Sequence, residues 1–486
     1  MNKTIRRASV FSLLLVLALL VRATWVQFYD GKALADNDDN RRKTIARYAY
    51  PLGDIIVGGK AVTGSAPTGG GSDLGYKRTY PGGSLYTAVT GYTSQVYGST
   101  QLEALYQDVL DGTATRLTNP LDTLTGKRPA PGDVITTIDP AVQKAAAKAL
   151  GSTKGAAVAI DPRTGRILGM VSSPSYDAST ISGSGAADAK AWKKLSDDKD
   201  VPTLNRALKQ ALPPGSTFKL VVAAAALENG LYGSVDERTD SPNPYLLPGT
   251  RTYLRNESAS APCENASLRT ALQYSCNNVF GKIAVELGQD KVRAMAEKFG
   301  FDDKKRDVPV RAAESVYPSG MDKAQTALSG IGQFDVTATP LQMAMVSATL
   351  ANGGRQASPH MVSEVTNADG DAIRTYPDSD TTRVVSASTA SQLQSAMETV
   401  VTKGTGTNAQ IAGATVGGKT GTAQHGENNS KTPYAWFTSY AKDNTTGKQI
   451  AVAVVVEQSD AARSEVSGNG LAAPIARAMM SAGLKG

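Results

Sequence analysis

An apolar segment close to the N-terminus constrains this chain more than any other feature. Ala8–Val21 contains 14 residues without a charge, and counting on through Phe28 gives 21, with Arg22 as the one charged residue in that length. About 20 apolar residues span a bilayer, and a long arginine side chain can reach the interface from within such a segment. No small-residue cleavage sequence follows closely, which favours an uncleaved anchor over a removed signal. The sequence therefore predicts one membrane-spanning helix.

Basic and aromatic residues at the two ends of this segment predict its orientation. Lys3, Arg6 and Arg7 precede it without any acidic residue, and Trp25 and Tyr29 follow it. Basic residues are retained on the cytoplasmic side, and Trp and Tyr are enriched at the interface. We therefore expect a single-pass cell-membrane protein whose chain after about residue 30 is extracytoplasmic.

Charge and residue counts exclude several classes of protein. The net charge is +7, but residues 1–22 hold four basic residues and no acidic one, which leaves only +3 for the remainder. Nucleic-acid binding by bulk charge is therefore not supported. Two Cys exclude a disulfide scaffold, and two His, His360 and His425, argue against a multi-histidine metal site. No nucleic acid, metal or cofactor is expected.

Two strand hairpins bracket the larger part of the chain. Ala156–Ile160 and Ile167–Ser172 flank one set of turn residues, and Ala435–Lys442 and Gln449–Glu457 flank another. Strands at both ends of a domain with helices between them predict an α+β fold, an antiparallel sheet covered by helices. The predicted helices are Ser216–Glu228, Leu268–Leu287, Pro340–Asn352, Ala387–Lys403 and about Ala472–Ala482.

The part before this domain has shorter elements. Gly53–Val57 and Lys60–Val62 predict a hairpin through Gly58-Gly59, Leu102–Asp111 predicts a short helix, and Asp139 before Pro140 caps a helix to about Leu150. We expect a smaller α+β module near the membrane. The predicted domains are 1–30 (cytoplasmic N-terminus and membrane anchor), 31–154 (membrane-proximal pedestal module) and 155–486 (the larger domain).

The string PPGSTFKL at 213–220 places a serine and a lysine three residues apart at the start of a helix. Residues at this spacing share one helix face, and a helix N-terminus favours a developing negative charge. A serine hydroxyl needs a base to become a nucleophile, and a lysine in an apolar site has a lowered pKa that suits it to that role. Ser216 and Lys219 are thus a candidate nucleophile and base. The same string would also fit a serine that only caps the helix, followed by a solvated lysine.

Two further strings are weak signals when each is taken alone. In Tyr274-Ser-Cys-Asn-Asn278, Ser275 and Asn277 are two residues apart and can project together from a bent segment, or simply form a polar bend. In VGGKTGTA at 416–423, two glycines precede Lys419-Thr420-Gly421-Thr422. They indicate either a strand whose backbone a ligand or another chain segment approaches closely, or a glycine-rich turn. A substrate could pair along such a strand, with Lys419, Thr420 and Thr422 holding a carboxylate.

Together, the order S-x-x-K, S-x-N, K-T-G resembles the catalytic set of penicillin-binding proteins and serine β-lactamases. From Gly155 to Leu484 the chain resembles their transpeptidase domain, and within the family it is most similar to class B enzymes, above all the actinobacterial penicillin-binding protein A type. The anchor and the stretch from Asn40 through Ile56 also resemble the class B membrane-proximal module. The further strings that carry the resemblance are Asn205-Arg206-Ala207, Gly332-Gln333, Thr339-Pro340-Leu341-Gln342, Gly404-Thr-Gly406 and Ala435-Trp-Phe437.

The resemblance implies a fold of the penicillin-binding transpeptidase and serine β-lactamase type, and acyl transfer without a cofactor. Lys219 would deprotonate Ser216, which would attack the D-Ala-D-Ala end of a peptidoglycan stem peptide. Ser275 would relay a proton to the departing D-Ala and Asn277 would orient Lys219, while Lys419, Thr420, Gly421 and Thr422 would form the substrate-binding strand. β-Lactams would be covalent inhibitors, and a glycosyltransferase of a division or elongation complex would be a partner.

Other functions fit the sequence less well. A D,D-carboxypeptidase would use the same residues with water as acceptor, and a non-catalytic β-lactam-binding subunit of a wall complex would not need all of them. Neither Glu286 nor Glu297 lies in the loop pattern that a class A β-lactamase needs for deacylation, and the first 150 residues lack the histidine of a glycosyltransferase motif.

Cysteine and histidine near these strings have weaker interpretations. Cys263 and Cys276 are 13 residues apart, and outside the membrane they would form a disulfide that fixes the second string, or else two buried small side chains. His425 follows the third string, and we expect it to be a loop residue near the cleft because Lys219 already serves as base.

Overall fold

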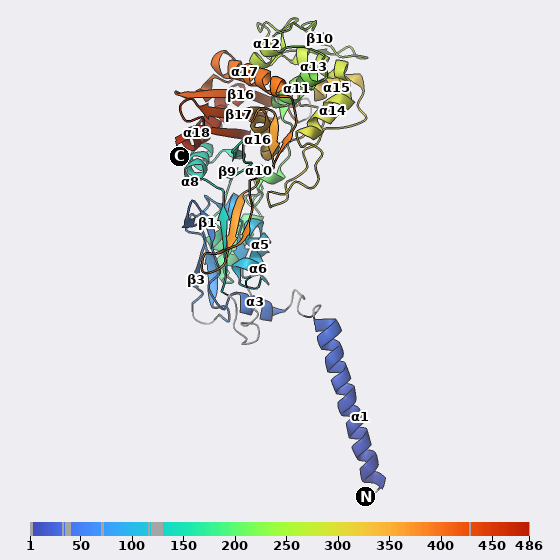
Figure 1. Ribbon diagram of the computed structural model, residues 1–486, viewed down its shortest axis with the longest axis vertical. Helices are drawn as coiled ribbons and strands as arrows, with labels where there is room; N and C mark the ends of the chain where they lie inside the picture. Colours follow the sequence, from blue (N-terminus) through green and yellow to red (C-terminus); the bar gives the residue numbers. More distant parts are fainter. Residues whose placement is uncertain are drawn as a thin grey trace.

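The computed structural model describes residues 3–31, 34, 40–69, 72–114, 117, 130–378, 380–426 and 429–485. Figure 1 shows an elongated molecule with three parts along its length. A lone helix lies at the N-terminal end, a smaller α+β part follows, and a larger part of sheet and helices contains the C-terminus.

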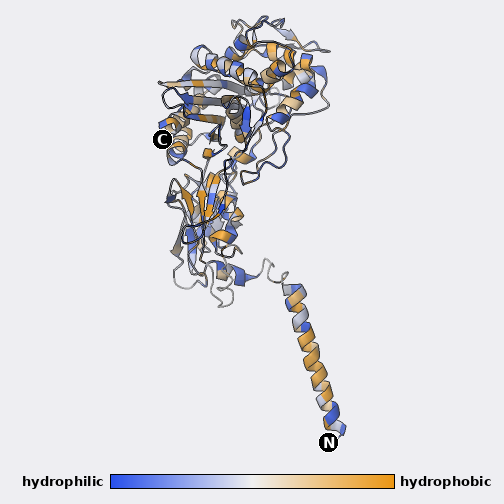
Figure 2. Cartoon of the chain, viewed as in Figure 1, coloured by the Kyte–Doolittle hydropathy of each residue, from blue (hydrophilic) through white to orange (hydrophobic). Residues whose placement is uncertain are grey.

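The predicted apolar helix is present. α1 (Lys3–Trp25) continues into a π-helical segment, η1 (Val26–Asp30), and together they form a 28-residue helix that contains an 18-residue window with a mean hydropathy of 2.1, long and apolar enough to cross a membrane. Its apolar side chains are exposed rather than packed against the remainder of the protein, and the ribbon of this helix is mostly orange, the hydrophobic colour, in Figure 2. An exposed helix of this kind fits a lipid environment.

The smaller part is built on a mixed five-stranded sheet with the order β14-β13-β7-β1-β2. The predicted hairpin through Gly58-Gly59 is confirmed as β1 (Ile55–Val57) paired with β2 (Lys60–Ala61), and β1 runs parallel to β7 (Asp133–Thr136). The other two strands, β13 (Val362–Thr366) and β14 (Ala372–Thr375), come from the C-terminal half of the chain. The two halves of the chain are thus joined through one sheet, which the sequence did not suggest.

Short elements complete this part, and in place of the single predicted helix at Leu102–Asp111 there are two shorter ones, α5 and α6. The elements are α3 (Arg41–Arg47), β3 (Gly64–Pro67), β4 (Tyr76–Thr79), α4 (Thr87–Thr90), β5 (Thr93–Ser94), β6 (Gly98–Ser99), α5 (Gln101–Leu105) and α6 (Gln107–Leu110).

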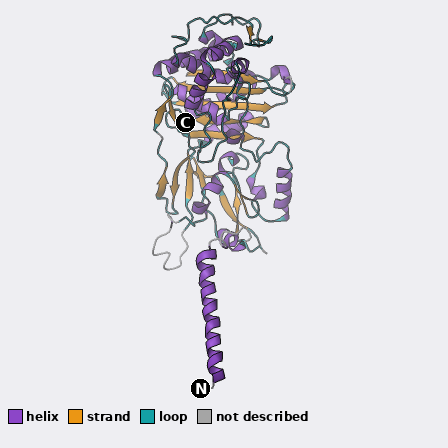
Figure 3. Cartoon of the chain, turned by 90° about the vertical axis from the view of Figure 1, so that its right-hand side faces the viewer, coloured by secondary structure: helices purple, strands orange, loops and turns teal. Residues whose placement is uncertain are grey.

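The larger part contains an antiparallel five-stranded sheet with the order β16-β17-β18-β8-β9. Its strands are the orange arrows in the upper part of Figure 3. Both predicted hairpins are confirmed within it. The strands are β8 (Lys154–Ile160), β9 (Ile167–Ser173), β16 (Ala414–Ala423), β17 (Tyr434–Asp443) and β18 (Gln449–Gln458). β16 is an edge strand, and within the part of the chain that the structure describes no strand pairs with the side away from β17.

Helices cover both faces of this sheet, and alternation along β18 shows how. Val452, Val454 and Val456 belong to the same core as α8 (Pro140–Leu150) and α18 (Ala473–Lys485). The alternate residues Ala451, Ala453 and Val455 belong to the core that includes α11 (Lys219–Glu228), α13 (Asn277–Leu287) and α16 (Pro340–Ala351). Because side chains alternate between the faces of a strand, a strand buried on both faces must be apolar along its buried length, as β18 is from Ile450 to Val456.

The predicted helices are present, with two differences at the segments that carry the first two strings. The first begins as a 3₁₀ turn before it becomes α-helical, and the predicted helix Leu268–Leu287 is divided in two. The helices concerned are η4 (Gly215–Phe218), α11 (Lys219–Glu228), α12 (Leu268–Gln273), α13 (Asn277–Leu287), α16 (Pro340–Ala351) and α17 (Ala387–Lys403).

The remaining elements connect these helices and strands. They are η3 (Ala178–Ile181), α9 (Ala186–Ser196), α10 (Arg206–Lys209), β10 (Tyr245–Leu246), β11 (Tyr253–Leu254), α14 (Gln289–Lys298), α15 (Lys323–Ser329), β12 (Arg355–Ala357), β15 (Thr381–Arg383), η5 (Thr407–Ala409), η7 (Arg463–Glu465) and η8 (Gly468–Ala472).

Candidate active site

A close backbone contact positions the first string. Gly215 has a φ of +54°, and its N–H donates to the carbonyl of Gly332 at 3.1 Å. A Cβ at Gly332 would lie 2.1 Å from the Gly215 carbonyl oxygen, so only glycine permits this approach. Ser216 follows in η4 and is 7% exposed, and Lys219 opens α11 and is fully buried.

The second string interrupts a helix with a strained residue. Ser275 has a φ of +59° between the end of α12 and the start of α13, a conformation that costs a residue with a side chain roughly 1–3 kcal/mol. The bend directs three acceptors at the first string. Lys219 Nζ donates to Ser275 O at 2.8 Å, to Asn277 Oδ1 at 2.7 Å and to Ser275 Oγ at 3.3 Å.

The third string lies on the edge strand β16 and reaches the same serine. Lys419 is fully buried, and its Nζ donates to Ser275 Oγ at 3.0 Å and to Thr420 O at 2.9 Å. A Cβ at Gly421 would lie 2.9 Å from the carbonyl oxygen of Pro214, so this glycine allows β16 to pack directly against the segment that carries Ser216. The structure therefore brings all three strings together, and Ser275 Oγ bridges the two lysine amines.

The threonines of the third string flank Lys419 on β16. Thr420 is buried, and its Oγ1 hydrogen-bonds Thr405 Oγ1 at 2.7 Å, in the turn after α17. Thr422 is half-buried further along the strand. His425 lies beyond the end of β16, where its ring stacks on Tyr434 at 3.9 Å and its Nε2 hydrogen-bonds Thr432 O, as expected for a loop residue.

Burial lowers the pKa of both lysines. Burial is the larger cause for Lys219, and the positive charge of Lys419 adds to it, so the pKa of Lys219 lies well below its usual value. Burial also lowers the pKa of Lys419, to about 7. A neutral Lys219 amine is a proton acceptor, which is the property the base role requires.

A base role for Lys219 would lead one to expect a hydrogen bond between its amine and Ser216 Oγ, and the structure shows other partners. Among the described residues its Nζ bonds to the second string and not to Ser216 Oγ, although both residues lie at the start of the same helix. Catalytic hydrogen bonds are often long before substrate binds and shorten in the complex. Asn277 and Ser275 thus hold the amine, which belongs to the residue one helical turn after Ser216.

A network that the sequence did not reveal supports the second string. Asn256 Oδ1 accepts hydrogen bonds from the backbone N–H groups of Asn277 and Asn278, and Asn256 Nδ2 donates to Asn278 Oδ1 at 2.9 Å. Arg255 O accepts from Asn277 Nδ2 at 2.9 Å, and Cys263 O from Asn278 Nδ2 at 2.8 Å. No spacing rule links positions 256 and 278, so only the folded chain identifies them as positioning residues.

The predicted disulfide is confirmed. Cys263 and Cys276 are bonded, with their Cα atoms 5.6 Å apart, and both are fully buried. Because Cys276 lies between Ser275 and Asn277, the bond fastens the second string to the segment that contains Asn256.

Replacing both cysteines by alanine should lower the free energy of unfolding by about 3 kcal/mol, because the bond closes a loop with a sequence separation of 13. Thermal unfolding followed by circular dichroism measures the change. The wild type should become less stable on incubation with dithiothreitol during the scan, whereas the alanine variant should not respond. Equal melting temperatures for the two proteins without reductant would contradict the prediction.

Comparison with known proteins identifies the family. Residues 155–481 match the family model of the penicillin binding protein transpeptidase domain. The chain belongs to the penicillin-binding proteins. Residues 52–134 also match the family model of the penicillin binding protein A dimerisation domain. The predicted class B family and its two modules are therefore confirmed.

Relatives of this penicillin-binding protein are similar over the whole chain. The peptidoglycan D,D-transpeptidase PbpA of Mycolicibacterium smegmatis is 38% identical, over 100% of this chain and 99% of the relative, and PbpA of Mycobacterium tuberculosis is 37% identical over 100% of both. The structure of M. tuberculosis penicillin-binding protein A as a ceftriaxone acyl-enzyme complex superimposes with a TM-score of 0.83 at 36% identity, covering 90% of this chain and 100% of that one. The predicted transpeptidase fold is confirmed.

Proposed function

We infer that this penicillin-binding protein is a serine-type peptidoglycan D,D-transpeptidase that β-lactams inhibit covalently, and we propose Ser216 as its nucleophile. Full-length relatives carry the name of this activity, and similar structures hold ceftriaxone and imipenem as acyl-enzymes. The observation that carries the assignment of residues is the meeting of Lys219 Nζ and Lys419 Nζ at Ser275 Oγ, next to Ser216.

The first half of the reaction forms an ester and releases D-alanine. Lys219 Nζ takes the proton of Ser216 Oγ, which attacks the carbonyl carbon of the penultimate D-Ala. The backbone N–H groups of Ser216 and Thr422 stabilise the oxyanion, an effect worth roughly 3–4 kcal/mol per donor. The C–N bond then breaks, and Ser275 relays the proton from Lys219 to the departing amine.

The second half forms the cross-link. An amine of a neighbouring stem peptide attacks the ester carbon, the new C–N bond replaces the bond to Ser216 Oγ, and the serine recovers a proton. Asn277 holds Lys219 through Oδ1. Lys419, Thr420 and Thr422 bind the donor carboxylate. Gly421 allows β16 to lie close to the backbone of the segment that carries Ser216.

The division into parts and the location follow from the same proposal. Residues 1–30 anchor the protein by one helix, residues 31–154 form most of the pedestal module, and residues 155–486 form the catalytic domain apart from β13 and β14, which return to the pedestal sheet. Lys3, Arg6 and Arg7 favour an extracytoplasmic catalytic domain, where peptidoglycan lies. A glycosyltransferase of the division or elongation complex would supply the uncross-linked strands.

The test is incubation of the full-length protein in detergent with a polymer of lipid-linked disaccharide pentapeptide, followed by muramidase digestion and mass spectrometry. Cross-linked dimers are expected, with release of one D-alanine per cross-link. Trimmed monomers without dimers would identify a D,D-carboxypeptidase. The absence of both dimers and trimmed monomers would identify a non-catalytic subunit.

A further inference from the structure

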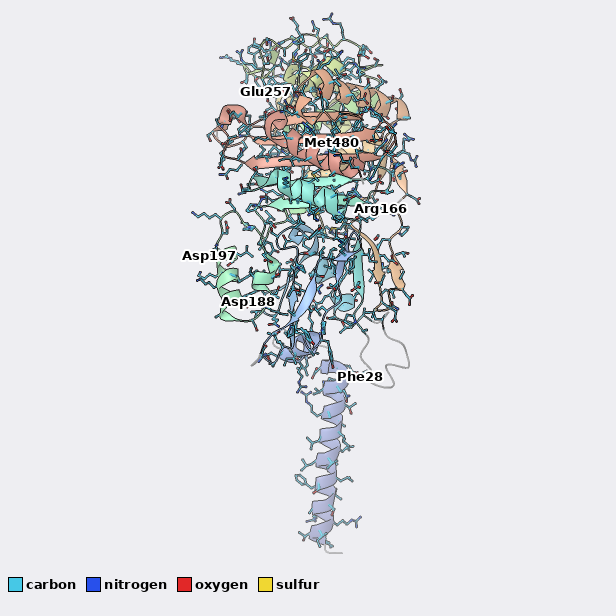
Figure 4. All side chains as sticks on the ribbon, turned by 90° about the vertical axis from the view of Figure 1, so that its left-hand side faces the viewer. Phe28, Arg166, Asp188, Asp197, Glu257 and Met480 are labelled. Carbon is cyan, nitrogen blue, oxygen red and sulfur yellow. A yellow bond between two sulfur atoms is a disulfide. The ribbon has the colours of Figure 1, made fainter. Side chains whose placement is uncertain are left out.

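A loop segment forms part of the active-site surroundings without contributing to the three strings. Residues 255 and 256 are hydrogen-bonded to the second string through Arg255 O and Asn256 Oδ1, and Cys263 is bonded to Cys276. Glu257 directly follows Asn256, so its backbone is adjacent to a residue that is hydrogen-bonded to Asn277, the residue whose Oδ1 accepts from Lys219 Nζ. Figure 4 shows Glu257 at the end of the molecule remote from Phe28, which lies in the membrane helix.

Glu257 is a carboxylate without a partner of its own. Its side chain is exposed, and it forms no hydrogen bond or ion pair within the described parts of the chain. Its charge nevertheless reaches both amines: burial lowers the pKa of Lys219 and of Lys419, and the Glu257 carboxylate opposes that effect at each. An exposed negative charge thus lies close to a centre whose own groups are hydroxyls, amides and amines.

We propose that Glu257 is a specificity-determining residue that attracts the cationic amine of the acyl acceptor to the Ser216 ester. The inference rests on the proposed function, because it concerns the second substrate of that reaction. The donor peptide ends in a carboxylate, which Lys419 attracts, whereas the acceptor arrives as an ammonium ion. A fixed opposite charge raises the local concentration of such an ion and gives it an advantage over water.

The chemistry that follows recruitment balances without a further reagent. The ammonium group held near Glu257 gives one proton to water and becomes an amine. The amine nitrogen then forms a bond to the ester carbon, the bond from that carbon to Ser216 Oγ breaks, and the second proton passes to the serine oxygen. Hydrolysis follows the same course with water in place of the amine.

The experiment measures how the acyl-enzyme is partitioned between an amine and water. The full-length wild type and Glu257→Gln are given a D-Ala-D-Ala donor peptide with glycinamide, and both products are quantified by chromatography. The product ratio does not depend on the acylation rate, because both products come from one acyl-enzyme. Exposed charge pairs contribute up to about 1 kcal/mol, so the ratio of aminolysis to hydrolysis should fall about three- to fivefold in Glu257→Gln. Glu257→Lys should lower it further.

Three comparisons make the result specific. Glu264→Gln removes the same charge from an exposed position on the same segment and should keep the wild-type ratio. In 1 M salt, where the screening length falls to about 3 Å, the difference between wild type and Glu257→Gln should disappear. With hydroxylamine, an acceptor that is uncharged near neutral pH, the two proteins should give equal ratios.

An unchanged product ratio in Glu257→Gln, or a decrease that persists in 1 M salt and with hydroxylamine, would overturn the assignment. Those outcomes are distinct from failure of the proposed function, in which the wild type would release no D-alanine and form no covalent adduct with penicillin.

Discussion

Replacing Ser216 by alanine should abolish covalent labelling by a fluorescent penicillin. Ser216 lies at the start of a buried helix, one turn before a lysine whose pKa burial lowers well below its usual value, and we propose its hydroxyl as the group that opens the β-lactam ring. Without Oγ no ester forms, so the labelled band should fall below detection on a denaturing gel. Intact-mass spectrometry should show the mass of one penicillin added to the wild type and none added to the variant.

The matched control for this prediction is Ser196→Ala. Ser196 is an exposed serine at the end of α9 that the mechanism does not use, and this variant should label like the wild type. Labelling that survives in Ser216→Ala would show that another residue is the nucleophile.

Lys219→Met should slow acylation by about 10²–10⁴-fold, the usual contribution of a general base. Methionine has a similar length and no proton acceptor of comparable strength, so the buried position stays filled while the base is lost. The second-order rate constant for penicillin acylation, measured by stopped-flow fluorescence or by timed labelling, checks the prediction. Circular dichroism should show a folded protein.

The pH profile of acylation distinguishes a base from a merely structural lysine. Activity should rise with pH as Lys219 loses its proton, at a pKa well below the usual lysine value. It should fall again as Lys419, with a pKa of about 7, loses the charge that binds the β-lactam carboxylate. Because both amines contact Ser275 Oγ, the measured values belong to the pair. In Lys219→Met the acid limb should be absent.

Lys298→Met serves as the control for the lysine substitution. Lys298 is exposed at the end of α14, and its replacement should leave both the rate and the pH profile unchanged. A Lys219→Met variant that is folded and acylates at the wild-type rate would remove Lys219 from the base role.

Several features of the fold are local and could be predicted from the sequence. The alternating apolar residues of β8, β9, β17 and β18 predicted two hairpins, and capping by Asp139 predicted the start of α8, where its side chain accepts from Ala141 N and Val142 N. The bounds predicted for α17, Ala387–Lys403, match the structure. Such features depend on side-chain periodicity and on hydrogen bonds between near neighbours, which short stretches of sequence contain.

The bend that divides the predicted helical stretch Leu268–Leu287 has a cause that lies outside that segment. Helix propensity runs through it, but Ser275 adopts a positive φ and directs its carbonyl and hydroxyl oxygens at Lys219 Nζ. The hydrogen bonds that Asn277 N–H and Asn278 N–H donate to Asn256 Oδ1, and the disulfide to Cys263, hold the chain at the bend. Tertiary contacts thus stabilise a conformation that the local sequence disfavours.

The sequence by itself indicated the residues that we propose for the chemistry, because two serines, two lysines and an asparagine in a fixed order can be recognised wherever they fold. Only the tertiary structure decided that Ser275 Oγ stands between Lys219 and Lys419, that β13 and β14 return to the membrane-proximal sheet, and that the segment of Asn256 and Glu257 is bonded to the second string. Desolvation and pairing between residues distant in sequence depend on which surfaces meet. Those two effects set the lysine pKa values, so reactivity here is a property of the packed domain.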